Sequence, residues 1–307
     1  MGRLPRSAFT PAINEVGVYL HLYNHLILDV KLGDAEKQYF LNLLKNTLQL
    51  YSIECLSAVV MQDSYHLVLY VPKETQPLQK ITTMLKHNGQ VPRDDYAQRR
   101  YEVSNKLSHF MNELQRSFTV WYNKTRPKHR YGALWQSRYK CLKLLDSTSL
   151  IHCIKYIELA PVRSQSVSTP DEYNYSTFGI SKKTSIHPFA ESFLKHMNKA
   201  LEQNLNFDNL IQIFQDDFFR LLNRKANGTL DKNKVKRLLA KKDKPILLQN
   251  SRLWTDSVAL GSREKLREYA SILWGPERAK KKKFGKVICN KEFEIYTMRQ
   301  LQTNIFN

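Results

Sequence analysis

The sequence predicts an α+β fold of two units, and three observations lead to that prediction. Four short runs are rich in β-branched and aromatic residues, as strands are, and they lie at 16–22, 53–61, 65–71 and 139–145. Apolar residues recur at helical spacing between and after these runs. A chain of 307 residues usually exceeds a single hydrophobic core. We therefore divide it into two units, 1–180 and 181–307.

The first unit alternates strands and helices. Asp34 opens a helix whose apolar positions share one face: Phe40, Leu43, Leu44, Thr47 and Leu48. The second strand turns at Asp63 directly into the third, which Pro72 stops. The order up to this point is β-α-β-β.

Two helices and a polar link are expected before the fourth strand. The helices lie at 77–87 and 107–122, and the arginine-rich segment 94–102 is interpreted as a connection. In the longer helix an aromatic stripe has the spacing that is typical of burial: Phe110, Phe118 and Trp121.

After the fourth strand, Ser147 is expected to cap a helix that carries Tyr156, and Pro161 to close it. The resulting order β-α-β-β-α-β is that of a ferredoxin-like split unit with added helices.

The second unit is predicted to be basic and mainly helical. Segment 186–222 is expected to form two helices, and Asn227-Gly228 is a turn signal in the very basic stretch that follows. Ser262 should cap a further helix. The four lysines at 280–283 are interpreted as a cationic arm that adds salt-sensitive affinity for a polyanion.

The charge of the chain indicates its class of partner. Lys and Arg number 48 against 28 Asp and Glu, a formal net charge of +20 with a pI of about 9.7, which favours nucleic acid. The basic residues are spread over both units rather than along one amphipathic helix, so a membrane surface is the weaker interpretation. The sequence has no apolar run of ~18 residues and no apolar signal core near residue 1, which predicts a cytoplasmic protein without a membrane partner.

Several short blocks resemble the REP-associated tyrosine transposases, a group of the HUH single-strand transposases. The blocks are 118–119, 121–123, 132–140, 156–163, 254–256 and 261–264. They extend over most of the chain, and the part from 132 to 163 is the most specific. The resemblance implies that 1–180 is an HUH transposase-like DNA-binding domain whose partner is hairpin or single-stranded DNA.

The resemblance also implies a chemistry. Members cut and rejoin single-stranded DNA through a tyrosine on a helix, which attacks the phosphate and becomes a phosphotyrosine; this residue matches Tyr156. A divalent metal, Mg or Mn, is implied on a His-hydrophobic-His strand motif and on a polar residue one helical turn after the tyrosine. These positions fall on Ser64 and His66 and on Ala160, so only His66 keeps a ligand. Since Mg²⁺ favours several oxygen ligands, we expect weak metal binding and impaired cleavage.

A second set of residues around the matched blocks is predicted to bind nucleic acid. Its cations would contact phosphates, and its two aromatic side chains would stack on unpaired bases: Arg130, Arg138, Lys140, Arg163, Tyr131 and Trp135. The ordinary alternative for the cations is a solvated basic face.

Other interpretations stay open. Taken alone, Tyr156 and His66 are the kind of residues that more often pack in a core. An active nuclease would need Asp63 or His152 to replace the missing ligands. A non-catalytic module could instead bind RNA or single-stranded DNA on its sheet. The sequence leaves open whether the protein is a monomer or a homodimer.

Overall fold

The structure, a computed structural model, describes most of the chain. The described residues are 6–12, 14–87, 94–184, 189–222, 232–241, 246–248, 254–255, 257–289 and 294–299.

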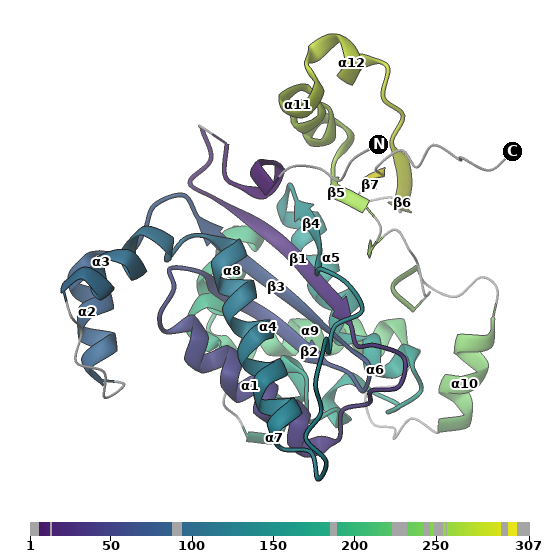
Figure 1. The fold of residues 1–307 in the computed structure, drawn as a ribbon. Helices are drawn as coiled ribbons and strands as arrows, with labels where there is room; N and C mark the ends of the chain where they lie inside the picture. Colours follow the sequence, from purple (N-terminus) through teal and green to yellow (C-terminus); the bar gives the residue numbers. More distant parts are fainter. Residues whose placement is uncertain are drawn as a thin grey trace, which may run out of the picture.

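The described chain contains a seven-stranded mixed sheet in the order β2-β3-β1-β4-β5-β7-β6 (Figure 1). Its strands are β1 Gly17–His25, β2 Glu54–Val60, β3 Ser64–Pro72, β4 Lys140–Leu144, β5 Ser257–Gly261, β6 Gly285–Cys289 and β7 Glu294–Arg299. The pairing is antiparallel throughout except between β4 and β5, which are parallel. The α+β prediction is confirmed. The prediction that the second unit is mainly helical was incomplete, because 181–307 contributes three strands to the sheet that the first unit begins.

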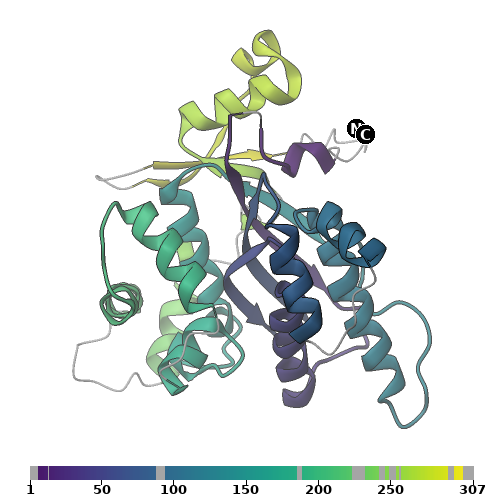
Figure 2. The ribbon, with the colours of Figure 1, turned by 90° about the vertical axis from the view of Figure 1, so that its left-hand side faces the viewer.

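The helices pack on both faces of the sheet, as Figure 2 shows. Their bounds are α1 Asp34–Leu48, α2 Leu78–His87, α3 Asp94–Val103, α4 Leu107–Lys124, α5 Ser147–Glu158, α6 Ala160–Arg163, α7 Thr177–Thr184, α8 Ala190–Leu201, α9 Phe207–Leu221, α10 Lys232–Ala240, α11 Arg263–Trp274 and α12 Pro276–Lys280. One apolar cluster joins α1 and α4 to one face of the sheet, and a second joins α5, α8 and α9 to the other. Two of the aromatic stripe residues, Phe110 and Phe118, are fully buried as predicted, and Trp121 is half-buried.

The strand register places polar residues on the α5 side. Tyr23 of β1 lies opposite His66 of β3, and His21 lies opposite Leu142 of β4. Directly opposite residues project to the same face, so the imidazoles of β1 and β3 share the face that α5 covers.

Helix α5 begins one residue earlier than its predicted cap implied. Asp146, not Ser147, is the N-cap: its Oδ1 accepts a hydrogen bond from the Ser149 amide at 2.8 Å. Asp146 Oδ2 also accepts from the amide of Ser262, 2.5 Å away, and Ser262 caps α11 as predicted. One carboxylate therefore stabilises the N-termini of two helices.

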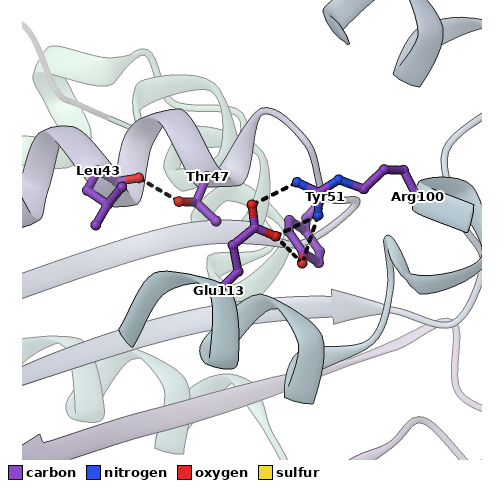
Figure 3. A network of polar contacts seen from close by, with 5 residues as sticks. All are labelled: Leu43, Thr47, Tyr51, Arg100 and Glu113. Carbon is purple, nitrogen blue, oxygen red and sulfur yellow. Dashed lines mark hydrogen bonds and ion pairs between the residues drawn. The ribbon is translucent and has the colours of Figure 1, made fainter. Parts of the chain in front are cut away.

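The segment expected as a polar connection is in fact α3. Its sequence has no broad apolar stripe, so periodicity failed to predict it. A tertiary ion pair holds it: the Arg100 guanidinium donates to both carboxylate oxygens of Glu113 on α4, at 2.6 and 2.7 Å, and the Tyr51 hydroxyl donates to the same group (Figure 3). Helices α2 and α3 project from the body beside a small cluster around Ile81 and Leu85 (Figure 1).

The C-terminal elements stand at one end of the sheet (Figure 2). The lysine run 280–283 is not a free arm throughout: Lys280 pairs with Glu277, and Lys282 lies over the Trp274 ring at 4.2 Å. The predicted turn at Asn227-Gly228 lies outside the described residues. Within the described part, no helix combines the length and the apolar character needed to cross a membrane.

Glu158 is a buried carboxyl that joins three elements. Its Oε1 accepts from Ser57 Oγ on β2 at 2.6 Å, and its Oε2 accepts from the Phe178 amide on α7 at 3.3 Å. Burial raises the pKa of Glu158 to about 7, although these hydrogen bonds oppose the shift. Glu158 therefore acts as a structural group on the side of α5 away from the tyrosine.

We predict that Glu113→Gln loosens α3 locally. Removing the charge that Arg100 pairs with should lower the free energy of opening of α3 by about 1–3 kcal/mol. Hydrogen exchange of residues 94–103 should quicken, while exchange in β1 and β3 stays slow. Tyr51→Phe is the matched control, since it removes the two hydrogen bonds of the phenol, with Glu113 and with Arg100, and leaves the ion pair. Equal exchange in wild type and Glu113→Gln would contradict this role of the ion pair.

We also predict a pH-dependent effect of Glu158→Gln. A carboxyl whose folded pKa is raised contributes stability that is present below its unfolded pKa and is lost as pH rises through the folded pKa. From about pH 4.5 to pH 8, the unfolding free energy of Glu158→Gln relative to wild type should rise by about 3 kcal/mol. Denaturant unfolding at several pH values measures this difference, and a constant difference would show that Glu158 titrates normally.

Candidate functional site

Tyr156 lies inside the molecule rather than at its surface. Helix α5 places its ring against the face of the sheet that carries the histidines, and only 4% of the residue is exposed. The ring stacks on Trp254, with centroids 4.9 Å apart and planes 14° apart. The Arg163 guanidinium carbon lies 3.8 Å from the ring centroid. Trp254, itself fully buried, thus covers the candidate nucleophile.

The surroundings of Tyr156 act on its acidity in opposite directions. Burial raises the pKa of the Tyr156 phenol, and the charge of Arg163 lowers it; burial is the larger effect. The phenolate needed for attack on a phosphate is therefore disfavoured in this closed arrangement.

His21 and His66 form a hydrogen-bonded pair on the face of the sheet that α5 covers. Nε2 of His21 lies 3.0 Å from Nδ1 of His66, and Nδ1 of His21 lies 3.1 Å from the Trp254 carbonyl oxygen. A carbonyl only accepts, so Nδ1 of neutral His21 carries the proton and Nε2 accepts from Nδ1–H of His66. Nε2 of His66 is consequently the ring nitrogen that retains a lone pair for a cation or a donor.

Burial keeps both imidazoles neutral. It lowers the pKa of His21 to about 4, with a further contribution from the positive charge of Arg163. It lowers the pKa of His66 well below its usual value, and His21, Arg163 and His25 add to the effect. Protonation of both rings would also give both facing nitrogens a hydrogen and break the bond between the rings.

The residues at the family's metal positions do not assemble a metal site. The Ser64 hydroxyl donates to Asp63 Oδ1 at 2.9 Å, and Ala160 offers no ligand atom. His152, one of the two possible substitutes, directs Nδ1 to the Thr148 carbonyl at 2.9 Å, and Asp63 lies 3.8 Å from the Lys31 ammonium. Among the described residues no three His, Cys, Asp or Glu side chains come together as ligands. A single imidazole nitrogen does not hold Mg²⁺ or Mn²⁺ firmly.

Arg163 is committed to the protein rather than directed to solvent. Its Nη1 donates to the Tyr156 carbonyl at 2.5 Å and to the Leu247 carbonyl at 3.0 Å. Burial lowers the pKa of Arg163 to about 10, which still leaves it charged at neutral pH. Nη1 of Arg163 is thus engaged by two carbonyl oxygens, and the phosphate contact that the sequence predicted for Arg163 stays a prediction.

Trp135 is also placed differently from its predicted role. It packs on the α1 and α4 face, edge-on to Tyr65 at 5.2 Å, and its Nε1 donates to the Gln115 carbonyl. This is the face opposite Tyr156, so Trp135 does not lie beside Tyr156, and its stacking on unpaired bases stays a prediction.

The remaining predicted contacts lie at the surface. Tyr131 is 87% exposed. Arg130 bonds to Asn123 and to the Ala133 carbonyl, which shapes the loop after α4. Arg138 and Lys140 are exposed, and Lys140 lies over the Tyr23 ring at 5.3 Å, on the histidine side of the sheet. Of these exposed cations, Lys140 is the one that contacts β1 on the face of the sheet that carries the histidines.

Two members of this site were missed in the sequence. His21, Tyr23 and His25 occupy alternate positions of one strand and so share a face, a pattern that could have indicated the first of them. The contact of Trp254 with Tyr156 joins residues that are far apart in the chain, and no local pattern indicates it.

We predict that His21 stays neutral in the Nδ1–H form down to about pH 4. A base whose folded pKa is depressed contributes stability above its unfolded pKa and loses it as pH falls through the folded pKa. As pH falls from 6.5 to about 4, the depressed pKa of His21 should therefore lower the free energy of unfolding by about 3 kcal/mol. Nitrogen-15 NMR of the imidazoles reports the tautomer, and His21→Gln should flatten the acid loss of stability by that amount. A His21 that gains a proton near pH 6.5 would refute the arrangement.

Comparisons with known proteins agree with the motifs. No family model matches the chain. A Haemophilus influenzae protein, provisionally named as a REP-associated tyrosine transposase, is 24% identical over 166 residues, or 52% of this chain and 82% of that protein. A solved structure of a REP-associated tyrosine transposase bound to a REP hairpin aligns with a TM-score of 0.40 and 15% identity, over 62% of this chain and 90% of the other. By sequence, this chain is thus similar over about half its length to a protein named as a REP-associated tyrosine transposase, and the resemblance seen in its motifs is confirmed.

Proposed function

We propose that this protein binds hairpin or single-stranded DNA, as a relative of the REP-associated tyrosine transposases in which cleavage and rejoining of the strand are impaired. The observation that supports impaired cleavage is the burial of Tyr156 against Trp254, together with a metal motif in which His66 alone keeps a ligand. The net charge of +20 and the similarity to the Haemophilus influenzae protein support DNA as the partner.

The arrangement of the first four strands supports a ferredoxin-like domain of the HUH kind. They lie in the order β2-β3-β1-β4 with every pair antiparallel, as a split β-α-β-β-α-β unit requires. Helix α5 then follows the fourth strand directly and carries Tyr156 to the sheet face of His66.

Cleavage by Tyr156 would demand more than this site supplies. The phenol oxygen must lose its proton and form a bond to phosphorus while the bond from phosphorus to the leaving sugar oxygen breaks. Burial disfavours the phenolate, and the residues present do not fit a divalent metal that would offset the phosphate charge. Loss of a Lewis acid removes several kcal/mol of transition-state stabilisation, and each ~1.4 kcal/mol is tenfold in rate.

The alternative function is a non-catalytic module that binds RNA or single-stranded DNA on its sheet. A sheet that binds RNA needs an exposed face with aromatic side chains. In the described structure the strands β1 to β4 are covered by helices on both faces, which argues against such a platform. The binding test therefore includes an RNA of equal length. A cytoplasmic location and a monomeric or homodimeric state stay predictions from the sequence.

The test is a gel assay with a labelled single-stranded hairpin, in Mn²⁺ or EDTA, for wild type and Tyr156→Phe. We expect both proteins to shift the hairpin equally in either condition. Covalent adduct should form, if at all, at least about 100-fold more slowly than expected of an intact metal site. RNA of equal length should bind more weakly.

Two outcomes would contradict the proposal. A denaturant-resistant protein–DNA adduct that needs both Tyr156 and Mn²⁺ would show a working transposase. Equal affinity for RNA and DNA would favour the general nucleic-acid module.

A further inference from the structure

A groove of about 690 Å³ lies on the outer side of α4, on the face of the molecule opposite Tyr156. Its lining residues on α4 recur three or four residues apart from His109 to Lys124, and so form one stripe along the helix. At 1.5 Å per residue this stripe is about 22 Å long. Its other walls come from α1, α3 and Tyr51.

The free charge of the groove is positive. Its carboxylate, Glu113, is already engaged by Arg100 and by the Tyr51 hydroxyl (Figure 3). Arg116 and Lys124 are exposed, and neither side chain has an ion-pair or hydrogen-bond partner in the part of the chain that the structure describes. Two fixed cations with no internal partner favour an anionic occupant.

The apolar part of the lining lies between these cations. Tyr39 and Trp121 stack with ring centroids 3.7 Å apart and planes 8° apart, and both are half-buried. Val120, which also lines the groove, is 44% exposed. An aromatic pair and an exposed aliphatic side chain beside unpaired cations suit a ligand with a flat apolar part and a phosphate.

We propose that a single strand of DNA lies along this groove, with a base against Tyr39, Val120 and Trp121 and its phosphates on Arg116 and Lys124. The inference rests on the proposed function in taking DNA as the anion, and it deepens it by adding a second contact surface away from α5. Tyr156 is buried and the groove is open, so DNA would be bound in the groove without reaching the tyrosine.

Fluorescence anisotropy with a labelled oligothymidine, at several salt concentrations, tests this. Arg116→Gln with Lys124→Gln should weaken binding about tenfold and lower the slope of log K against log salt by about 1.4, or 0.7 for each lost phosphate contact. Val120→Glu should weaken binding, because its carboxylate repels phosphate and pairs with Arg116 and Lys124, which lie four residues away on the same helix face. Lys199→Gln with Arg267→Gln is the control, because it removes equal charge from exposed positions outside the groove. It should leave the slope nearly unchanged.

Photo-crosslinking reports which residues lie beside a base, and a non-specific effect of charge would not produce that result. An oligonucleotide carrying 5-iododeoxyuridine should crosslink to a peptide that contains Tyr39 or Trp121. Groove and control variants with the same slope, or crosslinks only elsewhere, would overturn the inference. Displacement by free thymidine monophosphate at concentrations that match the oligonucleotide would also overturn it, in favour of a mononucleotide site.

The failure of this inference is distinguishable from failure of the proposed function. Wild type that binds the hairpin and the oligothymidine, with groove variants unaffected, would reject the groove alone. Wild type that binds neither would reject the proposed function as well.

Discussion

The contact of Trp254 with Tyr156 and His21 is the constraint on which the rest of this molecule depends. Its indole ring stacks on Tyr156 of α5, while its carbonyl accepts from His21 of β1, so one residue joins the C-terminal part to both elements. The carbonyl also sets the tautomer of His21, and through it that of His66. Burying so large an aromatic surface stabilises the fold. The same burial takes Tyr156 away from solvent, so stability and substrate access oppose one another at this position.

Arg163 does not restore what the metal positions have lost. A guanidinium near the phenol favours the phenolate and offers charge to a phosphate, as a cation should. Here, however, its donors are directed to the Tyr156 and Leu247 carbonyls, and the pKa of Tyr156 remains raised because desolvation is the larger effect. A nearby charge stabilises a transition state only when its donors point at the reacting group, and here Nη1 of Arg163 points at two carbonyl oxygens instead.

Local pattern predicted the parts of this fold that local chemistry determines. The periodicity after Asp34 and the aromatic stripe of α4 correctly predicted buried helix faces, and Ser262 was correctly predicted to cap α11. What failed depends on distant partners. Helix α3 is held by Arg100 and Glu113 rather than by its own apolar stripe. Strand β5 is defined by pairing with β4, β7 by pairing with β5, and β6 by pairing with β7. In the site, the strand motif identified His66, but its surroundings come from His21 and Trp254, which only the folded chain brings together.

Affinity for a polyanion and catalysis on it differ in how many atoms they require. Phosphate contacts are individually weak and spread over many exposed cations, so substitution at a few positions lowers affinity gradually. Cleavage needs one nucleophile, one source of charge and a reachable phosphate in fixed geometry, so the proposed loss of two ligands and the burial of Tyr156 would be enough to suppress it. The positive stripe on α4 shares no residue with the core around Tyr156. Under the proposed function, loss of chemistry on one face would leave the charge of the other face unchanged, which is a physical reason for binding to outlast cleavage.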